Sequence, residues 1–374
     1  MNELQKHIEV AIFRSAFGQN VRWLRKRLAP AKLCVVMKSD AYGHGLSELV
    51  ETAVEAGADY LGICTNDEAA QIRTRHPDHP VLRLRAALPD ELEESVESLR
   101  IEEIVGSAQV AGFLDKLGKR RGRPVPVHLK LDTGMGRTGL LPDQLEQAKR
   151  VCAMPGLRVR GIMTHLPSAD AADLSDTRRQ IEAFRNRVAK LADDLPGDVL
   201  VHSHNSAASV RLPKLRGGMV RVGAACYGVR TSTCFENPDA LLPVMRIRTR
   251  IMEVRQLPAG RTLGYGSLFR TVRPSRIATL PVGFGEGYPR ALFNKGIVLI
   301  KGQRCPVVGR VSLNVTAVDV TELEGDVRWG EEAVLVGSQG NETVTFEELA
   351  DLFSSVHTEI NLMAGRFNKR LYIA

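Results

Sequence analysis

Cysteine is scarce in this chain, and long apolar runs are absent. Six cysteines occur among 374 residues, and no two of them form a C-x-x-C pair. We therefore predict reduced cysteines and no metal site rather than a disulfide framework. Residues 1–7 hold no apolar run of the kind found in secretory signals, and no stretch elsewhere is long enough to cross a bilayer. We predict a cytoplasmic protein with no membrane partner.

Aromatic residues make up only 5% of the chain, although its net charge is +8. Two basic clusters, residues 22–27 and 119–123, contribute to this charge. Nucleic-acid surfaces commonly interleave basic with aromatic residues, and neither cluster follows that pattern. We interpret both clusters as solvated faces and predict no nucleic-acid partner.

Apolar patterning divides the chain into two parts. Short apolar runs alternate with helical patterns up to about residue 230, which is typical of a parallel (β/α)8 barrel. The eight predicted strands are Leu33–Met37, Tyr60–Cys64, Val81–Leu84, Glu103–Val105, Val125–Leu129, Leu157–Met163, Val199–His202 and Ala224–Val229. Later segments are short, β-rich and punctuated by glycine and proline, which indicates a separate all-β domain. We predict an α/β fold with a TIM-type barrel over residues 8–240 and a β-rich domain over 241–374, which an N-terminal strand within residues 1–12 joins.

One lysine directly follows a predicted buried strand. The segment Val35-Val36-Met37-Lys38-Ser39-Asp40-Ala41-Tyr42-Gly43-His44-Gly45 begins as a β-branched run and continues into a turn with two glycines. Barrel enzymes keep their chemistry at the C-terminal ends of their strands. A lysine amine there is a tunable base that can form a Schiff base with an aldehyde. A lone lysine before a βα loop is more often an ordinary surface residue, so its neighbours decide between the two interpretations.

Further polar groups follow other predicted strands. The run His128-Leu129-Lys130-Leu131-Asp132-Thr133-Gly134-Met135-Gly136-Arg137 ends in an arginine whose fork suits a carboxylate. Thr164-His165 ends another strand, where a lone histidine is more often structural than catalytic. Residues 201–208 combine hydroxyl groups with a predicted helix start, which is a natural seat for phosphate. Residues 219–223 place Arg221 before a glycine turn. Each of these patterns is weak alone.

Together and in this order, the motifs resemble the alanine racemase family of fold-type III pyridoxal phosphate (PLP) enzymes. The resemblance covers nearly the whole chain. It includes the lysine motif, H-L-K-x-D-T-G-M-G-R, the T-H pair, H-x-x-N-S-A-A, R-x-G and the segment Gly309-Arg310-Val311-Ser312. It implies an isomerase, an amino-acid racemase that binds PLP and acts as a homodimer on a small-molecule amino-acid substrate.

The resemblance also implies a role for individual residues. Lys38 is expected to bind PLP as a Schiff base, and Tyr265 to reach the active site of the other subunit. Lys130 occupies a position that is often carbamylated in the family, where the added negative charge orients Arg137. Other expected cofactor contacts are Tyr42, His165, His202, Ser206, Arg221, Gly223 and Ala224. Arg137 and the backbone of Leu313 are expected to lie near the substrate carboxylate.

Racemisation requires a base on each face of the substrate. An α-proton is too weakly acidic for unaided removal, and PLP supplies the electron sink. The resemblance implies that Lys38 acts on the D-enantiomer and Tyr265 on the L-enantiomer. Their usual pKa values, about 10.4 and 10, require tuning by burial or by nearby positive charge. Arg221 is expected to face the pyridine nitrogen and to disfavour its protonation, which limits side reactions such as transamination.

Three departures from the family pattern fall in the substrate entrance. The usual G-Y-A-D-G-Y segment has Phe284 in place of a gate tyrosine, and the usual V-S-M-D ends in Asn314. A second gate tyrosine near the C-terminus is missing, and Asn361, to within one residue, takes its place. These changes predict either an altered or broader substrate, such as serine or a basic amino acid, or drift around an intact alanine site.

Two other functions compete with racemisation. Fold-type III decarboxylases of basic or diamino acids share the barrel and β-domain, although the Arg221 segment and the D-T-G-M-G-R loop resemble the racemases more closely. A non-catalytic PLP carrier would need neither a β-domain nor a second base such as Tyr265.

Overall fold

The structure is a computed structural model that describes residues 7–212, 217–230 and 240–374. Its contacts divide the chain into two compact units. The barrel unit comprises residues 17–41 and 46–242, and the β unit comprises residues 1–16, 42–45 and 243–374. No helix within the described ranges combines the length and the apolar character that a membrane crossing needs.

The barrel unit is built on eight parallel strands. They are β2 (Lys32–Val36), β3 (Tyr60–Ile63), β4 (Val81–Arg83), β5 (Glu103–Val105), β6 (Val125–Lys130), β7 (Leu157–Met163), β8 (Leu200–His202) and β9 (Met219–Val222). They pair in two rows, β4-β3-β2-β9 and β5-β6-β7-β8. A parallel bridge between Leu82 and Glu102 joins the rows on one side. On the other side, between β9 and the residues after β8, the Arg221 amide donates to the His204 carbonyl at 3.0 Å. The predicted α/β barrel is therefore confirmed.

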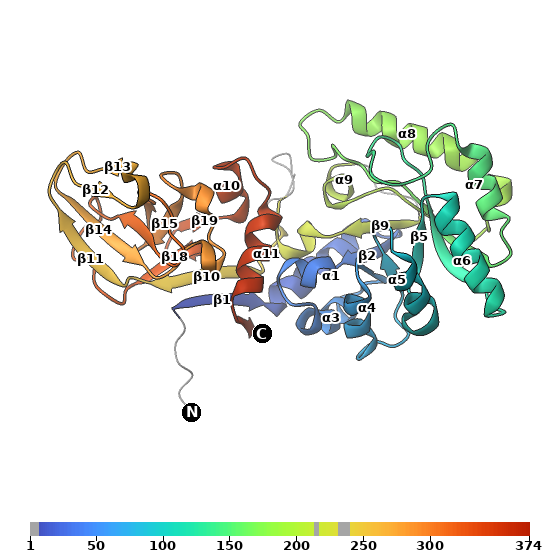
Figure 1. Cartoon of the computed structure of the whole chain (residues 1–374), viewed down its shortest axis with the longest axis horizontal. Helices are drawn as coiled ribbons and strands as arrows, with labels where there is room; N and C mark the ends of the chain where they lie inside the picture. Colours follow the sequence, from blue (N-terminus) through green and yellow to red (C-terminus); the bar gives the residue numbers. More distant parts are fainter. Residues whose placement is uncertain (1–6, 213–216, 231–239) are drawn as a thin grey trace. The chain divides into compact units, whose positions relative to one another are not determined.

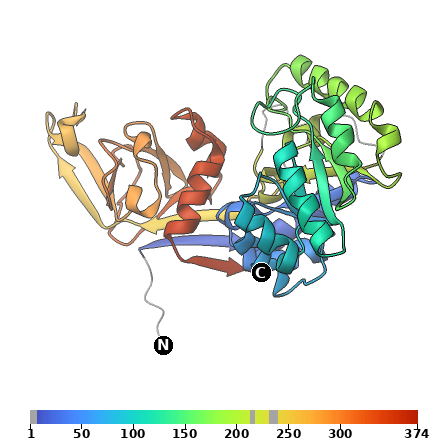
Figure 2. The same cartoon turned by 45° about the vertical axis from the view of Figure 1, so that its right-hand side comes forward.

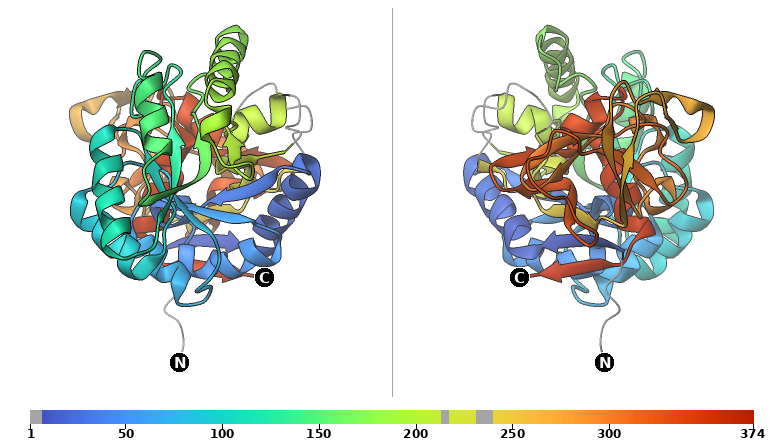
Figure 3. Two further views of the ribbon diagram at one scale, coloured as in Figure 1. Left: turned by 90° about the vertical axis from the view of Figure 1, so that its right-hand side faces the viewer. Right: turned by 90° about the vertical axis from the view of Figure 1, so that its left-hand side faces the viewer.

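Helices cover the outside of these strands (Figures 1 and 3). They are α1 (Arg14–Leu28), α3 (Leu46–Glu55), α4 (Asn66–Arg73), α5 (Pro89–Glu94), η1 (Ser95–Leu99), α6 (Ala108–Arg120), α7 (Leu145–Cys152), α8 (Ser175–Ala189), η2 (Ala192–Asp194) and α9 (Ser206–Arg211). Their apolar faces and the outward faces of the strands form a core cluster that includes Leu114, Leu129 and Phe184. The strands' inward faces contribute a smaller cluster: Cys34, Tyr60, Leu82, Ile104, Met163 and Met219.

The predicted eighth strand at Ala224–Val229 is wrong. These residues begin a 3-10 turn, η3 (Ala224–Tyr227), and the last barrel strand is β9 (Met219–Val222), which ends two residues before that turn. Gly223, at φ −112° and ψ −89°, ends the extended backbone. The sequence analysis missed β9 because the charged Arg221 interrupts the apolar run that is typical of a buried strand.

The β unit contains one large sheet and two smaller ones. The large sheet has the order β16-β15-β18-β10-β1-β20, with β19 beside β18; the others are β11-β14-β17 and β12-β13. Strand β1 (Ile8–Phe13) pairs with β10 (Met245–Arg250) antiparallel and with β20 (Arg370–Ile373) parallel (Figure 2). The N-terminal strand thus lies between the first and the last strand of the part of the chain that follows residue 242.

The remaining elements of the β unit complete these sheets. The strands are β11 (Glu253–Leu257), β12 (Thr262–Leu263), β13 (Phe269–Arg270), β14 (Ser275–Leu280), β15 (Ile297–Ile300), β16 (Gln303–Pro306), β17 (Thr316–Asp319), β18 (Glu332–Gln339) and β19 (Glu342–Val344). The helical elements are η5 (Tyr265–Ser267), η6 (Phe284–Glu286), η7 (Arg290–Leu292), α10 (Phe346–Asp351) and α11 (His357–Phe367).

Candidate active site

Lys38 lies two residues after the C-terminal end of β2, where it begins α2 (Lys38–Tyr42), an unusual turn. Ser39, Asp40, Ala41 and Tyr42 all have left-handed backbone angles, with φ between 52° and 54°. Such angles cost non-glycine residues roughly 1–2 kcal/mol each. The surrounding structure must therefore hold this turn in place.

Two acidic side chains hold the turn. The Glu68 carboxylate accepts hydrogen bonds from the Ser39 amide at 2.5 Å and from the Cys64 amide at 2.7 Å. The Asp40 carboxylate accepts from the Leu46 amide at 2.7 Å. Glu68 also completes the capping box that starts α4 with Thr65. Our sequence analysis missed Glu68, although a Thr-x-x-Glu pattern before an apolar run is a helix-start signal that could have found it.

Four cations at the ends of barrel strands or in the loops after them act on His165. Burial, and then the charges of Arg221, Arg137, Lys130 and Lys38, lower the pKa of the His165 imidazole to about 3. The structure therefore brings five of the predicted site residues together. His165 is neutral at physiological pH, and the surrounding charges create a strongly positive environment that suits an anionic ligand.

Lys130 is the last residue of β6 and is only 2% exposed. Its Nζ donates to the Thr138 hydroxyl at 2.6 Å. Burial, followed by repulsion from Arg137 and Arg221, lowers the pKa of its amine to about 8, while Asp132 opposes this shift. A substantial neutral fraction of this amine is thus present near physiological pH.

The loop that carries Arg137 is held at both ends by an arginine from α8. Arg187 is 8% exposed. Its guanidinium donates to the carbonyls of Asp132 at 3.0 Å, Leu140 at 3.1 Å and Leu141 at 2.7 Å. These acceptors flank Arg137 on both sides. Our sequence analysis missed Arg187, because no local pattern shows that an arginine 50 residues away in a helix will turn inward.

Arg221 lies in β9 with 4% of its surface exposed. Its guanidinium donates to His202 Nδ1 at 2.8 Å and to the Thr164 carbonyl at 2.8 Å, with longer contacts to the His202 carbonyl and His165 Nδ1. All these acceptors are neutral. Burial lowers the pKa of Arg221 to about 10, so it remains a cation at neutral pH.

Ser206, Gly223 and Ala224 lie around the start of α9. Asn205 caps this helix by accepting a hydrogen bond from the Ala208 amide at 3.0 Å. The Gly223 amide donates to the Ser206 hydroxyl at 3.0 Å. Ala224 follows as the first residue of η3. A hydroxyl and a loop amide therefore lie next to one another at a helix start, and such donors suit a phosphate group.

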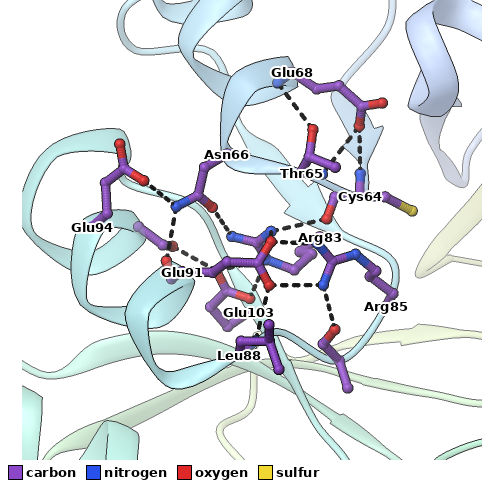
Figure 4. Close-up of polar contacts among 12 residues, drawn as sticks. Cys64, Thr65, Asn66, Glu68, Arg83, Arg85, Leu88, Glu91, Glu94 and Glu103 are labelled. Carbon is purple, nitrogen blue, oxygen red and sulfur yellow. Dashed lines mark hydrogen bonds and ion pairs between the residues drawn. The ribbon is translucent and has the colours of Figure 1, made fainter.

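A second buried polar cluster lies at the ends of β3 and β4 (Figure 4). Arg83, the last residue of β4, is fully buried and donates through Nε to both oxygens of Glu103, at 2.8 and 3.1 Å. Its other nitrogens bind the Cys64 carbonyl and the Asn66 side chain. Nearby, Arg85 pairs with Glu91 and lowers the pKa of that carboxyl to about 2.

The remaining predicted residues belong to the β unit. Tyr265, on η5, is 73% exposed, and Leu313 is 55% exposed. The Asn314 side chain donates to Glu286 at 2.6 Å, and the Gly285 amide, next to Phe284, donates to the Leu313 carbonyl at 2.7 Å. Phe284, Leu313 and Asn314 are therefore neighbours.

Tyr42 and Asn361 also lie in the β unit. Asn361, on α11, is 1% exposed, and its Oδ1 has no hydrogen-bond partner among the described residues. Gly43, next to Tyr42, packs directly on α11: a Cβ added there would lie 2.6 Å from the Asn361 carbonyl oxygen. The residues after the lysine turn thus approach the helix that carries Asn361.

The barrel residues fit PLP, which is an anionic aldehyde. A lysine amine at the end of a strand can bind the aldehyde. A serine hydroxyl beside loop amides suits the phosphate. Among the described residues Arg221 has no carboxylate as a hydrogen-bond partner, so none of these contacts neutralises its charge. Cationic groups without acidic partners are what a phosphate and a carboxylate ligand require.

Comparison with known proteins identifies relatives along the whole chain. The alanine racemase N-terminal domain family matches residues 12–231, and the alanine racemase C-terminal domain family matches residues 244–372. An alanine racemase from Syntrophobacter fumaroxidans is 38% identical over 96% of both chains. A broad specificity amino-acid racemase from Pseudomonas taetrolens is 35% identical over 99% of this chain and 90% of its own. A lysine racemase from Proteus mirabilis is 33% identical over 97% of this chain and 89% of its own.

Solved structures give the same result. Alanine racemase from Streptomyces lavendulae matches with a TM-score of 0.91 and 29% identity, over 100% of this chain and 98% of its own. Alanine racemase from Bartonella henselae, solved with covalently bound pyridoxal phosphate, matches with a TM-score of 0.90 and 26% identity, over 98% of this chain and 100% of its own.

Proposed function

The chain belongs to the alanine racemase family and is a PLP-dependent amino-acid racemase, and from this premise we propose that Lys38 and Tyr265 are its two proton-transferring groups. When bound, PLP supplies the electron sink that makes the substrate's α-proton removable. Lys38 holds the cofactor and exchanges a proton on one face of the substrate, and the phenol of Tyr265 does so on the other face. The barrel unit, residues 17–41 and 46–242, carries Lys38 and most of the cofactor contacts, and the β unit carries the tyrosine.

The observation that carries this proposal is the cluster of cations around His165. Arg137 and Arg221 offer positive charge to the substrate carboxylate and to the cofactor ring, respectively. His165, with its pKa lowered to about 3, contributes a neutral ring that packs against the cofactor.

The cofactor phosphate binds to Ser206, Tyr42 and the amides of Gly223 and Ala224. His202 supports Arg221 from behind, at 2.8 Å. Lys130, once carbamylated, pairs with Arg137 and orients its fork toward the substrate carboxylate. We assign the backbone of Leu313 to the same substrate carboxylate.

A homodimer is the catalytic unit, and each active site receives Tyr265 from the second copy of the chain. Tyr265 supports this arrangement because it is 73% exposed within its own chain. A large aromatic side chain that is left in solvent by its own subunit is typical of an interface residue. Mixing a Lys38→Ala chain with a Tyr265→Phe chain tests this proposal: hybrid dimers regain activity in one of their two sites only if the sites are shared.

The substrate range extends beyond alanine. Phe284, Asn314 and Asn361 remove two gate phenols and one negative charge from the entrance region. The Oδ1 of Asn361 is buried without a partner among the described residues, and a polar atom in that state favours a ligand that carries a hydrogen-bond donor. Relatives named as broad specificity and lysine racemases are nearly as similar to this chain as those named alanine racemases.

Chiral chromatography of the PLP-loaded enzyme tests the function directly. L-alanine, L-serine, L-lysine and L-arginine are incubated separately, and we expect D-enantiomers from alanine and from at least one larger substrate. Conversion of alanine alone would contradict the broader range. Release of CO2 without racemisation would identify a decarboxylase instead. Tyr265→Phe should abolish turnover while the absorbance of bound PLP remains, and unchanged activity would refute the two-base assignment.

A further inference from the structure

A line of buried polar side chains crosses the interior of the barrel behind Arg221. Its Nη1 lies 2.8 Å from His202 Nδ1, and His202 Nε2 lies 2.8 Å from His128 Nδ1. His128 Nε2 in turn lies 2.7 Å from the Glu102 carboxylate. Arg221, His202 and His128 are at most 4% exposed. Three hydrogen bonds therefore connect the guanidinium to the carboxylate of the residue directly before β5.

The two ends of this line fix the direction of every hydrogen bond in it. Arginine only donates, and an ionised carboxylate only accepts. His202 Nδ1 must therefore accept from Arg221. Burial, followed by the charge of Arg221, lowers the pKa of His202 well below its usual value, so this ring is neutral and carries its proton on Nε2. It follows that His128 accepts at Nδ1 and donates from Nε2 to Glu102.

The surrounding structure makes room for the two imidazoles. Their ring centroids lie 4.9 Å apart at an interplanar angle of 85°. Gly161, in β7, leaves the space in which they meet: a Cβ there would lie 2.2 Å from His128 Nδ1 and 3.0 Å from His202 Nε2. The Tyr60 hydroxyl, 3.5 Å from the other oxygen of Glu102, borders the far end of the line. Barrel interiors are normally filled by branched apolar side chains, so this polar line departs from the usual filling.

We propose that Glu102 and His128 are positioning residues for Arg221: the carboxylate sets the tautomer of His128, His128 sets that of His202, and His202 then presents a lone pair to the guanidinium. If the line were reversed, His202 would direct an N–H at the N–H of Arg221, and the guanidinium would lose an acceptor. This inference rests on the proposed contact between Arg221 and the cofactor ring. The tautomers of His128 and His202, however, depend only on residues of this chain.

The tautomers can be measured on the cofactor-free protein. In ¹⁵N-histidine-labelled enzyme, His128 and His202 should each show one protonated nitrogen, at Nε2, with both signals assigned by single His→Gln variants. An Nδ1–H tautomer in either ring would overturn the inference. So would a doubly protonated His128, because its Nδ1 would then have no lone pair for His202. This measurement is independent of whether the enzyme racemises anything.

Two variants of Glu102 test the consequence for the site. Glu102→Gln keeps an acceptor oxygen without the charge, and Glu102→Met removes the acceptor at similar volume. We expect Glu102→Met to show mixed tautomers in both rings, an altered absorbance spectrum of bound PLP, and a kcat lowered about tenfold with KM changed less than about twofold, since one buried hydrogen bond is lost. Glu102→Gln should restore all three properties to near wild-type values.

The outcomes distinguish this inference from the proposed function. Unchanged tautomers and an unchanged PLP spectrum in Glu102→Met would overturn the positioning role even in an active racemase. Equal effects of both variants would also overturn it, since the charge rather than the acceptor would then matter. If the proposed contact of Arg221 with the cofactor is wrong, the tautomers will change in Glu102→Met while the spectrum of bound PLP stays constant.

Discussion

Two buried arginines in barrel strands have opposite surroundings. Arg83 is 0% exposed and bonds both oxygens of the Glu103 carboxylate. Arg221 is 4% exposed, and its hydrogen-bond acceptors are imidazole nitrogens and backbone carbonyls. The two arginines are buried to nearly the same degree. Arg83 is compensated by the negative charge of Glu103, whereas the described partners of Arg221 carry no negative charge.

This difference separates a structural role from a functional one. Burying a charge without an ionic partner destabilises the folded state by several kcal/mol. Such a residue therefore does not contribute to stability. Arg83 avoids much of this destabilisation by pairing with Glu103. Arg221 does not avoid it, which is reasonable only if a ligand completes the site. The contrast predicts that substitutions at the two arginines will affect different measurements.

The largest effect on stability should come from Arg83→Met. This change leaves the Glu103 carboxylate buried without its partner, and breaking a buried ion pair costs about 3–5 kcal/mol. Urea unfolding of the cofactor-free protein measures the change in the free energy of unfolding. Arg83→Met with Glu103→Leu is the matched control, because removing both charges should recover much of the loss. A loss below about 1 kcal/mol in the single variant would show that the pair has no structural role.

Arg221→Met should have the reverse profile. The substitution removes a buried charge but also leaves the Thr164 carbonyl and His202 without their donor, so we expect the free energy of unfolding to change by less than about 2 kcal/mol. Turnover should fall about 100-fold, equivalent to about 2.7 kcal/mol of transition-state stabilisation. Steady-state kinetics and urea unfolding of the same preparation test both statements. A stability loss equal to that of Arg83→Met would erase the distinction between the two arginines.

A smaller effect is expected at Arg187. Arg187→Met leaves the carbonyls of Asp132, Leu140 and Leu141 without this donor and loosens the loop that carries Arg137. KM should rise by about three- to tenfold, while kcat changes less, because the loop positions Arg137, which we propose binds the substrate carboxylate in the ground state as well. Arg187→Lys keeps the charge but not the forked guanidinium, so its KM should lie between those of the native enzyme and of Arg187→Met. An unchanged KM would mean that the loop keeps its conformation without the arginine.

Motifs that are contiguous in the sequence were predictable, and contacts formed by folding were not. The lysine turn, the D-T-G-M-G-R loop and the barrel alternation are local patterns, so the family, the fold and the cofactor could be predicted. Arg187 and Glu102 lie far from any motif, and only the closed barrel brings them to the loop and to His128. The last barrel strand was misplaced for a related reason, since Arg221 interrupts its apolar pattern and only the folded structure provides that arginine with acceptors.

The smallest expected effect concerns Lys130, whose lowered pKa makes it reactive toward CO2. Its pKa falls from 10.5 to about 8, so the neutral amine, which is the form that adds CO2, increases as the pH rises through 8. With ¹³C-bicarbonate, a carbamate signal should grow between pH 7 and 9 and be missing in Lys130→Met. Bicarbonate should lower KM about twofold in the native enzyme and not in this variant, since carbamylation exchanges repulsion of Arg137 for attraction.

The same shift has a consequence for stability without CO2. The folded protein binds fewer protons than the unfolded chain between pH 8 and 10.5, so the free energy of unfolding should rise over that interval relative to Lys130→Met. Below pH 8 the native lysine is charged and buried beside Arg137 and Arg221, and the difference between the two proteins should be constant. If the difference in the free energy of unfolding were independent of pH throughout, the Lys130 amine would have its ordinary pKa. The repulsion of Lys130 by Arg137 and Arg221 would then be weaker than the structure indicates.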